Sequence, residues 1–299
     1  MMRIVVTGRE GQVARSLGEC GAMGGHDVIA LDRFDLDLAG EHDAIIASVK
    51  AADPEVIVSA AAYTAVDAAE REQELAFAVN GKGAGAVAHA AAALSVPLIH
   101  LSTDYVFDGE KSSPYGEADP VGAVGVYGAS KLAGERAVLA AYENTVVVRT
   151  AWIYSPFGTN FVKTMLRLAK DHEEIAVVAD QIGNPTSALD IADGILVLAH
   201  NLMTSSDRIR RGIFHMCGAG EVSWADFAES IFEASALCGG PVARVKHIRS
   251  ADYPTVARRP ANSRLDCGKL AQIHGIRLPP WRDSLKVVVK RLIEGVNER

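Results

Sequence analysis

The chain has 299 residues, which corresponds to one large or two modest domains at roughly 150 residues per domain. Hydrophobic residues make up 49% and charged residues 22%, so the composition excludes a disordered, collagen-like or coiled-coil chain. Asp and Glu number 37 against 30 Lys and Arg, which gives a net charge of −7, and no basic block is present. This balance argues against a nucleic-acid partner held by phosphate contacts.

The sequence predicts a cytoplasmic protein that does not enter a membrane. Its first apolar run is too short for the core of a signal peptide and leads directly into glycine. No stretch reaches the ~18 to 20 apolar residues that a membrane helix needs. The cysteines are too far apart for a zinc knuckle or a disulfide framework, so we expect reduced thiols. They are Cys20, Cys217, Cys238 and Cys267.

The first half of the chain alternates short β-branched runs with longer helical patterns. Strands are predicted at residues 3–7, 28–31, 56–60, 98–102 and 146–149. Helices are predicted between them at residues 12–23, 41–52, 75–93 and 130–141. Such alternation indicates βαβ crossovers. The predicted fold class is therefore α/β, with a Rossmann-like, doubly wound parallel sheet.

After about residue 150 the alternation becomes irregular, with loops that contain Pro and Gly. Helices are predicted at residues 161–170, 188–202, 224–237 and 281–294, and strands at 175–178 and 212–216. We expect residues 1–150 to form an NAD(P)-binding Rossmann domain. Residues 151–299 should form mainly a smaller, mixed α/β substrate-binding lobe, whose strands can return to the main sheet.

A glycine-rich turn follows the first predicted strand and opens the first predicted helix. Gly8 permits a tight turn, and Gly11 allows the backbone to approach a pyrophosphate. The free N–H groups of the helix N-terminus favour an anion at the same place. Ala14 replaces the third glycine of the usual fingerprint. The strand, turn and helix together predict a dinucleotide site.

Two neighbouring residues at the end of the second predicted strand favour different cofactors. The Asp32 carboxylate suits the ribose 2′-hydroxyl of NAD, whereas the Arg33 guanidinium suits the 2′-phosphate of NADP. The sequence therefore leaves NADPH or NADH open. Asp37 and Leu38 are expected on the next loop, within reach of the adenine.

Tyr127 and Lys131 lie four residues apart on a predicted helix, and therefore on one face of it. On that face the cation is expected to lower the pKa of the phenol, as a proton shuttle to a carbonyl requires. A polar cluster, residues 102–107, ends the preceding apolar strand. The carboxyl ends of strands are where open α/β sheets bind ligands, so both motifs predict one site.

These motifs resemble the extended short-chain dehydrogenases that act on nucleotide-activated sugars. The motifs in question are residues 8–14 and 102–107 together with Tyr127 and Lys131. Four further segments are similar, in order along nearly the whole chain, to the dTDP-4-dehydrorhamnose reductase family. They are residues 59–67, 149–154, 180–186 and 257–265.

This resemblance implies reduction of the 4-keto group of dTDP-4-dehydro-L-rhamnose to dTDP-L-rhamnose, the last step in making that sugar donor. Tyr127 would protonate the developing alkoxide, Thr103 would hold the carbonyl oxygen, and Lys131 would tune Tyr127 and hold the nicotinamide ribose. Tyr105 and Trp152 would line the sugar pocket with Thr103 and Tyr127. The implied cofactor contacts are Gly11, Gln12, Val13, Asp32, Asp37, Leu38, Ala61, Ala62 and Tyr63, beside Gly8, Tyr127 and Lys131.

Several alternatives stay open. Strand alternation should turn only one of Ser102 and Thr103 into the cleft, so Ser102 is the alternative to Thr103. The pair Arg258 and Arg259 could supply charge for a pyrophosphate. Asp104 is followed by a tyrosine and not by the second carboxylate of the related dehydratases, which disfavours water elimination.

The protein could also reduce another nucleotide 4-keto-6-deoxysugar, or act as a noncatalytic regulatory subunit like that of methionine adenosyltransferase. A homodimer is compatible with the sequence. No metal is expected, because His215 and Cys217 alternate along a predicted strand and lack further ligands. Ser16 and Leu189 stand where the resemblance implies carboxylates that bridge some family dimers through a metal, which disfavours that assembly.

Overall fold

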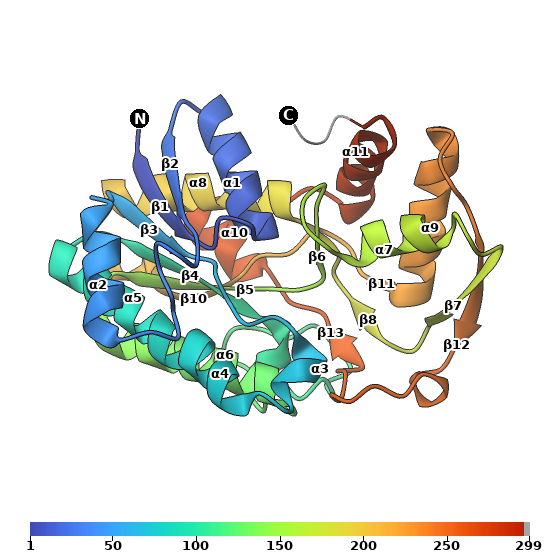
Figure 1. Ribbon diagram of the computed structural model, residues 1–299, viewed down its shortest axis with the longest axis horizontal. Coiled ribbons are helices and arrows are strands. Elements are labelled where there is room, and N and C mark those ends of the chain that lie inside the picture. The colour runs from blue at the N-terminus through green and yellow to red at the C-terminus, as the bar shows by residue number, and fades with distance from the viewer. Residues whose placement is uncertain (296–299) are drawn as a thin grey trace.

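The computed structural model describes residues 1–295 and contains a parallel sheet of six strands (Figure 1). Each neighbouring pair of strands is parallel. The strand order is β10 (Gly212–His215), β5 (Thr145–Thr150), β4 (Leu98–Thr103), β3 (Val56–Ser59), β1 (Arg3–Thr7) and β2 (Asp27–Leu31). The predicted α/β, Rossmann-like fold is confirmed.

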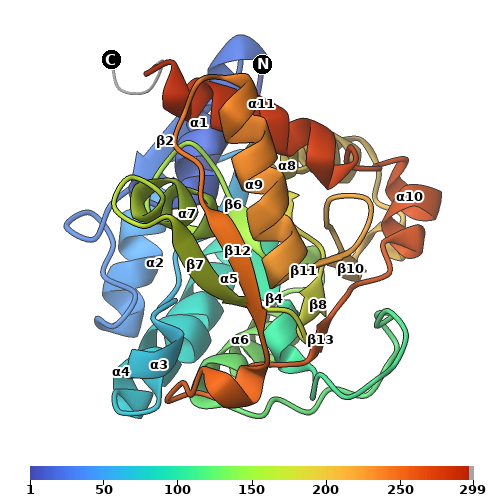
Figure 2. The same ribbon diagram turned by 90° about the vertical axis from the view of Figure 1, so that its right-hand side faces the viewer.

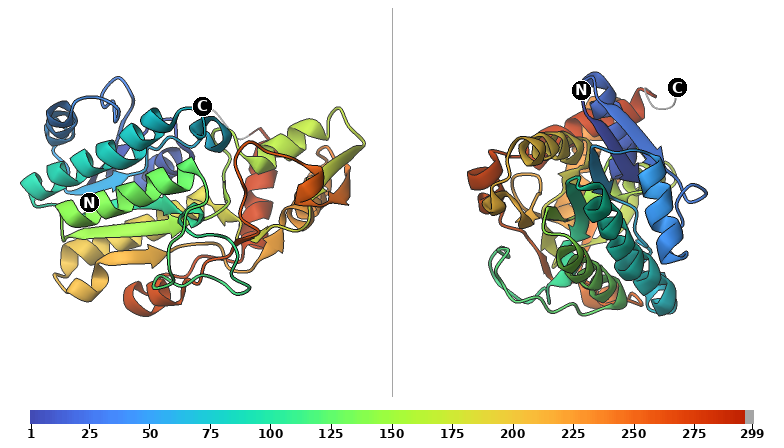
Figure 3. Two further views of the ribbon diagram at one scale, coloured as in Figure 1. Left: turned by 90° about the horizontal axis from the view of Figure 1, so that it is seen from below. Right: turned by 90° about the vertical axis from the view of Figure 1, so that its left-hand side faces the viewer.

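Helices cover both faces of this sheet (Figure 3). Ile4 and Val6 of β1 belong to one apolar core, and Val5 between them belongs to the other. This alternation explains the uninterrupted apolar run of the strand. The first core is covered by α1 (Gln12–Met23), α8 (Ala188–Thr204) and α10 (Gly268–His274), and the second by α2 (His42–Ala51), α5 (Ala84–Leu94) and α6 (Val126–Ala141). None of the helices within residues 1–295 is long and apolar enough to cross a membrane.

The second lobe has an apolar core of its own, centred on Phe227 and Trp281, whose ring centroids lie 5.4 Å apart. Its helices are α7 (Phe161–Leu168), α9 (Trp224–Leu237) and α11 (Trp281–Ile293). Figure 2 shows β7 (Glu174–Val178) and β12 (Arg244–Ile248) side by side, paired in parallel next to α9. Short strands complete the lobe: β6 (Ile153–Tyr154) with β9 (Thr186–Ser187), and β8 (Ile182–Gly183) with β11 (Val222–Ser223) and β13 (Asn262–Ser263).

The helix predicted at residues 75–93 is wrong in its interior. The chain forms α4 (Gln73–Phe77), a π-helical segment at Ala78–Gly83, and then α5. The Asn80 side chain in the π-helical segment bonds the backbone N–H and C=O of Tyr63 and the hydroxyl of Ser130. Helical periodicity in the sequence does not distinguish this wider turn from an α-helix. The short helix α3 (Val66–Ala69) precedes this region.

The strand order changes direction between β1 and β3, because β2 lies on one side of β1 and β3 to β5 lie on the other. Open α/β sheets bind ligands at such a switch point, beyond the carboxyl ends of the strands. The side chain of Thr7 joins the two strand ends there, since its Oγ1 accepts the N–H groups of Ala60 at 3.0 Å and Ala61 at 2.9 Å.

Candidate active site

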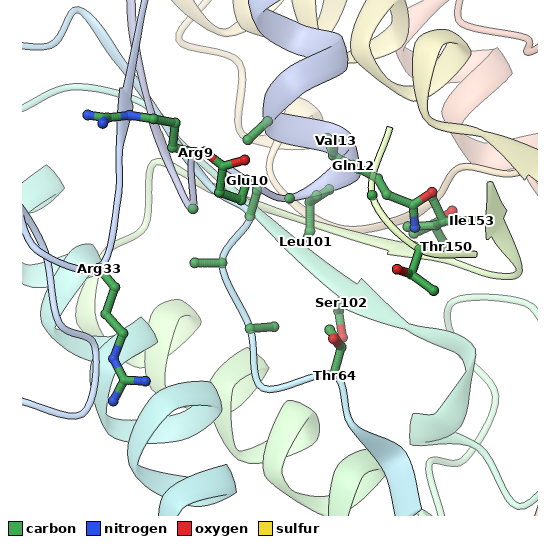
Figure 4. A pocket seen from close by; sticks show the side chains of 18 of the residues that line it. Arg9, Glu10, Gln12, Val13, Arg33, Thr64, Leu101, Ser102, Thr150 and Ile153 are labelled. Atoms are coloured by element: carbon green, nitrogen blue, oxygen red, sulfur yellow. The ribbon is translucent and has the colours of Figure 1, made fainter. Parts of the chain in front are cut away.

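A cavity of about 480 Å³ opens at this switch point, and we call it the switch-point cavity (Figure 4). The turn after β1 and the segment after β3 form two of its walls. In Figure 4, Arg9 and Arg33 lie at one end, and Gln12, Thr150 and Ile153 at the other. The cavity is therefore elongated along the edge of the sheet.

The glycine turn is closed against the segment after β3. Gly8 has φ +89°, and a Cβ built on it would lie 3.0 Å from the Cβ of Ala61. Gly11 is the N-cap of α1, and no side chain caps that helix end. The first N–H groups of α1 are thus free to bind an anion. The buried Thr150 Oγ1, on the same wall, has no hydrogen-bond partner among the described residues. A dinucleotide fits this set of donors.

An ion-pair network lies at the Arg9 end of the switch-point cavity. The Arg9 guanidinium bonds Asp32 at 2.7 Å and Asp35 at 2.9 Å. The backbone N–H groups of Asp35 and Phe34, and then the charge of Arg9, hold the pKa of Asp32 below its usual value. Arg33 lies 3.8 Å from Asp37. Both a carboxylate and two guanidinium groups are therefore present where a ribose 2′-position would be recognised.

Most of the predicted cofactor residues line the switch-point cavity. They are Gly8, Gly11, Gln12, Val13, Asp32, Ala61, Ala62, Tyr127 and Lys131. Asp37, Leu38 and Tyr63 are not on this wall within the described part of the chain. Asp37 accepts the N–H of Ala39, Leu38 is buried, and the Tyr63 hydroxyl donates to Glu72.

Tyr127 and Lys131 lie in the first turns of α6 and both reach the switch-point cavity. The Lys131 ammonium donates to the carbonyl oxygen of Leu101 at 2.6 Å. Burial lowers the pKa of Lys131 to about 8, and it raises the pKa of Tyr127 above its usual value. The expectation that Lys131 lowers the Tyr127 pKa is wrong, because desolvation of the phenol dominates and raises that pKa.

Thr103 links Tyr127 to a buried carboxylate. Its hydroxyl donates to Asp104 Oδ1 at 3.0 Å, and a hydrogen bond with Thr103 opposes the rise of the Tyr127 pKa. Burial raises the pKa of Asp104 to about 6. Ser102, the alternative to Thr103, lies on the wall of the switch-point cavity, whereas Thr103 lies beside the Tyr127 phenol.

A larger cavity of about 830 Å³ lies in the second lobe, and we call it the lobe cavity. Tyr105 is on its wall, and the Tyr105 ring meets the Tyr127 ring edge to face with centroids 5.5 Å apart. This pair of rings lies between the two cavities. Residues from α7, β7 and the segment 250–259 form most of the remaining wall.

Trp152 supports the lobe cavity from behind. It stacks on Trp224, with ring centroids 3.5 Å apart, and Trp224 forms the wall. Trp152 has φ +49°, and a Cβ on Gly183 would lie 2.4 Å from its ring. An aromatic residue held in this conformation indicates a position fixed by its surroundings.

Arg258 and Arg259 both reach the lobe cavity, but their partners differ. Arg259 bonds Asp67 at 2.7 Å and lies 3.5 Å from the Tyr105 hydroxyl. Arg258 pairs with Glu110 near the surface. Sequence reasoning did not single out Trp224 and Asp67, because their positions depend on the packing of distant segments. Asp67 lies within the motif at residues 59–67, which was the available signal.

The sheet, the switch-point cavity and the Tyr127–Lys131 pair define a nicotinamide-dependent oxidoreductase of the short-chain dehydrogenase class. A UDP-glucose 4-epimerase of Thermus thermophilus, solved with NAD, shares the fold with a TM-score of 0.78 at 19% identity. A family model described as the RmlD substrate binding domain matches residues 2–294. The chain belongs to the dTDP-4-dehydrorhamnose reductase family, as its motifs predicted.

Relatives support this assignment along the whole chain. A dTDP-4-dehydrorhamnose reductase of Sinorhizobium fredii is 50% identical over 98% of this chain and 99% of its own. The solved reductase of Clostridium acetobutylicum has a TM-score of 0.90 at 36% identity and covers 97% of this chain and 99% of its own. The Bacillus anthracis reductase, solved in complex with NADP, has a TM-score of 0.88 at 34% identity and covers 96% of this chain and 98% of its own. The bound NADP of this relative agrees with the prediction of a nicotinamide cofactor.

Proposed function

We propose that this chain reduces the 4-keto group of dTDP-4-dehydro-L-rhamnose to dTDP-L-rhamnose, the last step of dTDP-rhamnose synthesis. The observation that carries the proposal is the position of Tyr127. Its side chain lies on the wall of the switch-point cavity, and its ring contacts Tyr105 on the wall of the lobe cavity. A phenol between a cofactor and a sugar can protonate a carbonyl that is being reduced.

The nicotinamide supplies hydride to C4 when it is bound. The C4–O π electrons then move to the oxygen, and the Tyr127 hydroxyl transfers its proton to that oxygen. Because burial keeps the phenol protonated, Tyr127 enters the reaction as an acid. The Thr103 hydroxyl can rotate from Asp104 to hold the carbonyl oxygen, and the Lys131 ammonium would hold the nicotinamide ribose and stabilise the phenolate that forms.

The remaining predicted contacts belong to the same proposal. Gly8, Gly11, Gln12, Val13, Ala61 and Ala62 would cradle the cofactor from the switch-point cavity, and Asp32 would bind its ribose. In the lobe cavity, Arg259 would bind the substrate pyrophosphate, and Trp152 would hold Trp224 against the nucleotide sugar. Asp37, Leu38 and Tyr63 remain proposed cofactor contacts that lie outside the wall of the switch-point cavity.

We also propose the division into a cofactor domain at residues 1–150 and a substrate lobe at residues 151–299. The walls of the two cavities support this division, but β10, α8 and α10 of the second half pack on the main sheet. We propose further that the protein is cytoplasmic and forms a homodimer. The nucleotide-sugar substrate of the family supports the cytoplasmic location.

The first test is the loss of nicotinamide absorbance with dTDP-4-dehydro-L-rhamnose and either NADH or NADPH, with the product identified by NMR. We expect dTDP-L-rhamnose. The 4-keto-6-deoxy sugar of D configuration is the matched control, and equal or faster turnover of that sugar would show that the assigned substrate is wrong. Folded protein that binds the cofactor but turns over neither sugar would point to the regulatory role.

A further inference from the structure

A buried ion pair lies behind the switch-point cavity and is not part of its wall. Glu135 stands on α6 one turn after Lys131, and Arg149 stands on β5. Arg149 donates to the two Glu135 carboxylate oxygens, from Nε at 2.8 Å and from Nη2 at 2.7 Å. Both side chains are only 2% exposed. Neither residue is on the wall of the switch-point cavity or the lobe cavity.

The ion pair is connected to the wall of the cavity through β4. The Ser102 hydroxyl donates to Glu135 at 2.5 Å, and Ser102 lines the switch-point cavity. The neighbouring residue Leu101 accepts the Lys131 ammonium at 2.6 Å. Two consecutive residues at the end of β4 are therefore fixed by two side chains that lie one helical turn apart on α6.

Stability alone does not explain this arrangement. A buried ion pair loses hydration on both partners, and well-packed apolar residues of similar volume often stabilise a fold equally or better. The pair is also incompletely satisfied, since the buried Arg149 Nη1 has no hydrogen-bond partner among the described residues. A role of the Glu135–Arg149 pair in the neighbouring switch-point cavity would account for a buried carboxylate on this part of α6.

We propose that Glu135 is a positioning residue: its carboxylate, held by Arg149 and bonded to Ser102, fixes the end of β4 that carries Ser102 and the carbonyl acceptor of Lys131. The inference rests on the proposed function, because it acts through the role given there to Lys131. Glu135 itself touches neither substrate nor cofactor.

The charges around Lys131 support this role. Burial lowers the pKa of Lys131, and the Glu135 carboxylate acts in the opposite direction. His100 on β4 is buried, and its pKa is held well below the usual value by burial and by Lys131, so it adds no charge at neutral pH. Tyr127 on α6 remains a neutral phenol. Arg149 on β5 is also buried, and its charge is paired with that of Glu135.

The test compares kcat/KM against pH for the full-length protein and two variants that change the charge in opposite directions. Glu135→Gln should move the alkaline midpoint down by about one pH unit, because Lys131 then loses its proton more easily. Arg149→Met should move the midpoint up, because Lys131 is left as the partner of the carboxylate. Val138→Ala, a buried change on the same helix, is the control and should lower thermal stability without moving the midpoint.

A purely structural role would contradict the inference: Glu135→Gln would then lower kcat/KM equally at every pH. If Glu135→Gln does not fold, the double variant Glu135→Leu/Arg149→Met replaces it, and a midpoint no lower than that of Arg149→Met would overturn the inference. Lys131→Met separates the two proposals. Normal turnover of Lys131→Met would contradict the proposed function itself, whereas loss of turnover with an unmoved Glu135→Gln midpoint contradicts only the role of Glu135.

Discussion

The switch-point cavity and the lobe cavity are assembled from different kinds of sequence segment. The switch-point cavity is formed mainly where strands of one sheet end, at residues 8–14, 60–62, 64 and 101–102. The lobe cavity combines α7, β7, the start of α9 and the loop 250–259, which are packed around a separate core. The regular order of strands in the sheet determines where the switch-point cavity lies. The lobe cavity depends instead on packing contacts between distant parts of the chain.

The polar groups of the two cavities also differ in whether they already have partners within the protein. In the switch-point cavity, Lys131 and Thr150 are buried, and the Thr150 hydroxyl has no hydrogen-bond partner among the described residues, so it is available to a ligand. In the lobe cavity, Arg259 is already paired with Asp67, so an incoming anion must compete with a carboxylate. We expect substitutions in the first cavity to reduce turnover or cofactor binding, and substitutions in the second to raise the substrate KM.

The largest expected effect is at the junction of the two cavities. Tyr127→Phe removes the proposed acid and should lower kcat by at least about a hundredfold, with cofactor binding nearly unchanged. Tyr105→Phe is the matched control, because it removes the neighbouring hydroxyl, 3.5 Å from Arg259, and should affect mainly KM. Stopped-flow turnover and cofactor titration measure both quantities. Near-normal kcat in Tyr127→Phe would refute the mechanism.

The next largest effect is expected in the lobe cavity and should change substrate binding alone. Arg259→Ala should raise the KM for the nucleotide sugar by roughly 10- to 100-fold, the scale of one charge-assisted hydrogen bond, and leave the cofactor Kd unchanged. Arg258→Ala is the control, because the Arg258 side chain is 63% exposed and pairs with Glu110, and its effect should be several times smaller. Equal KM changes in both variants would remove the distinction between the two arginines.

The contrast between the cavities also explains what could be predicted from the sequence. The predicted strand at residues 3–7 and the predicted helix at 12–23 match β1 and α1, because buried apolar runs and the glycine turn are local signals. The Arg244–Ile248 strand was not predicted: it is polar, and it is stabilised by pairing with β7. The stacking of Trp152 on Trp224 brings together residues from separate segments, which periodicity does not show.

The same limit applies to electrostatics. The four-residue spacing of Tyr127 and Lys131 correctly placed both side chains on one cavity wall. It did not show that each group is buried or that Lys131 bonds the carbonyl of Leu101. Desolvation depends on the packed surroundings, so the direction of the Tyr127 pKa shift could not be obtained from spacing alone.

A smaller effect is expected from pH. Lys131 is an ammonium below its pKa of about 8 and becomes neutral above it, while Tyr127 stays protonated. The reductive kcat/KM should therefore be level below about pH 8 and fall roughly tenfold per unit above it. Lys131→Arg keeps the charge, so its lower activity should persist to higher pH. An unchanged alkaline limb in Lys131→Arg would assign the limb to another group.

The smallest effect concerns the Arg9 end of the switch-point cavity. In the unsubstituted protein Arg9 bonds Asp32 at 2.7 Å. Asp32→Ala removes the carboxylate that would bind the ribose 2′-hydroxyl, and it also releases Arg9 from this bond. NADH should bind several-fold more weakly, while NADPH should lose less, because a freed guanidinium can bind its 2′-phosphate. Asp35→Ala is the control: it also releases Arg9 but keeps Asp32. Fluorescence titration gives both Kd values, and an equal loss for the two cofactors in Asp32→Ala would exclude Asp32 from the ribose site.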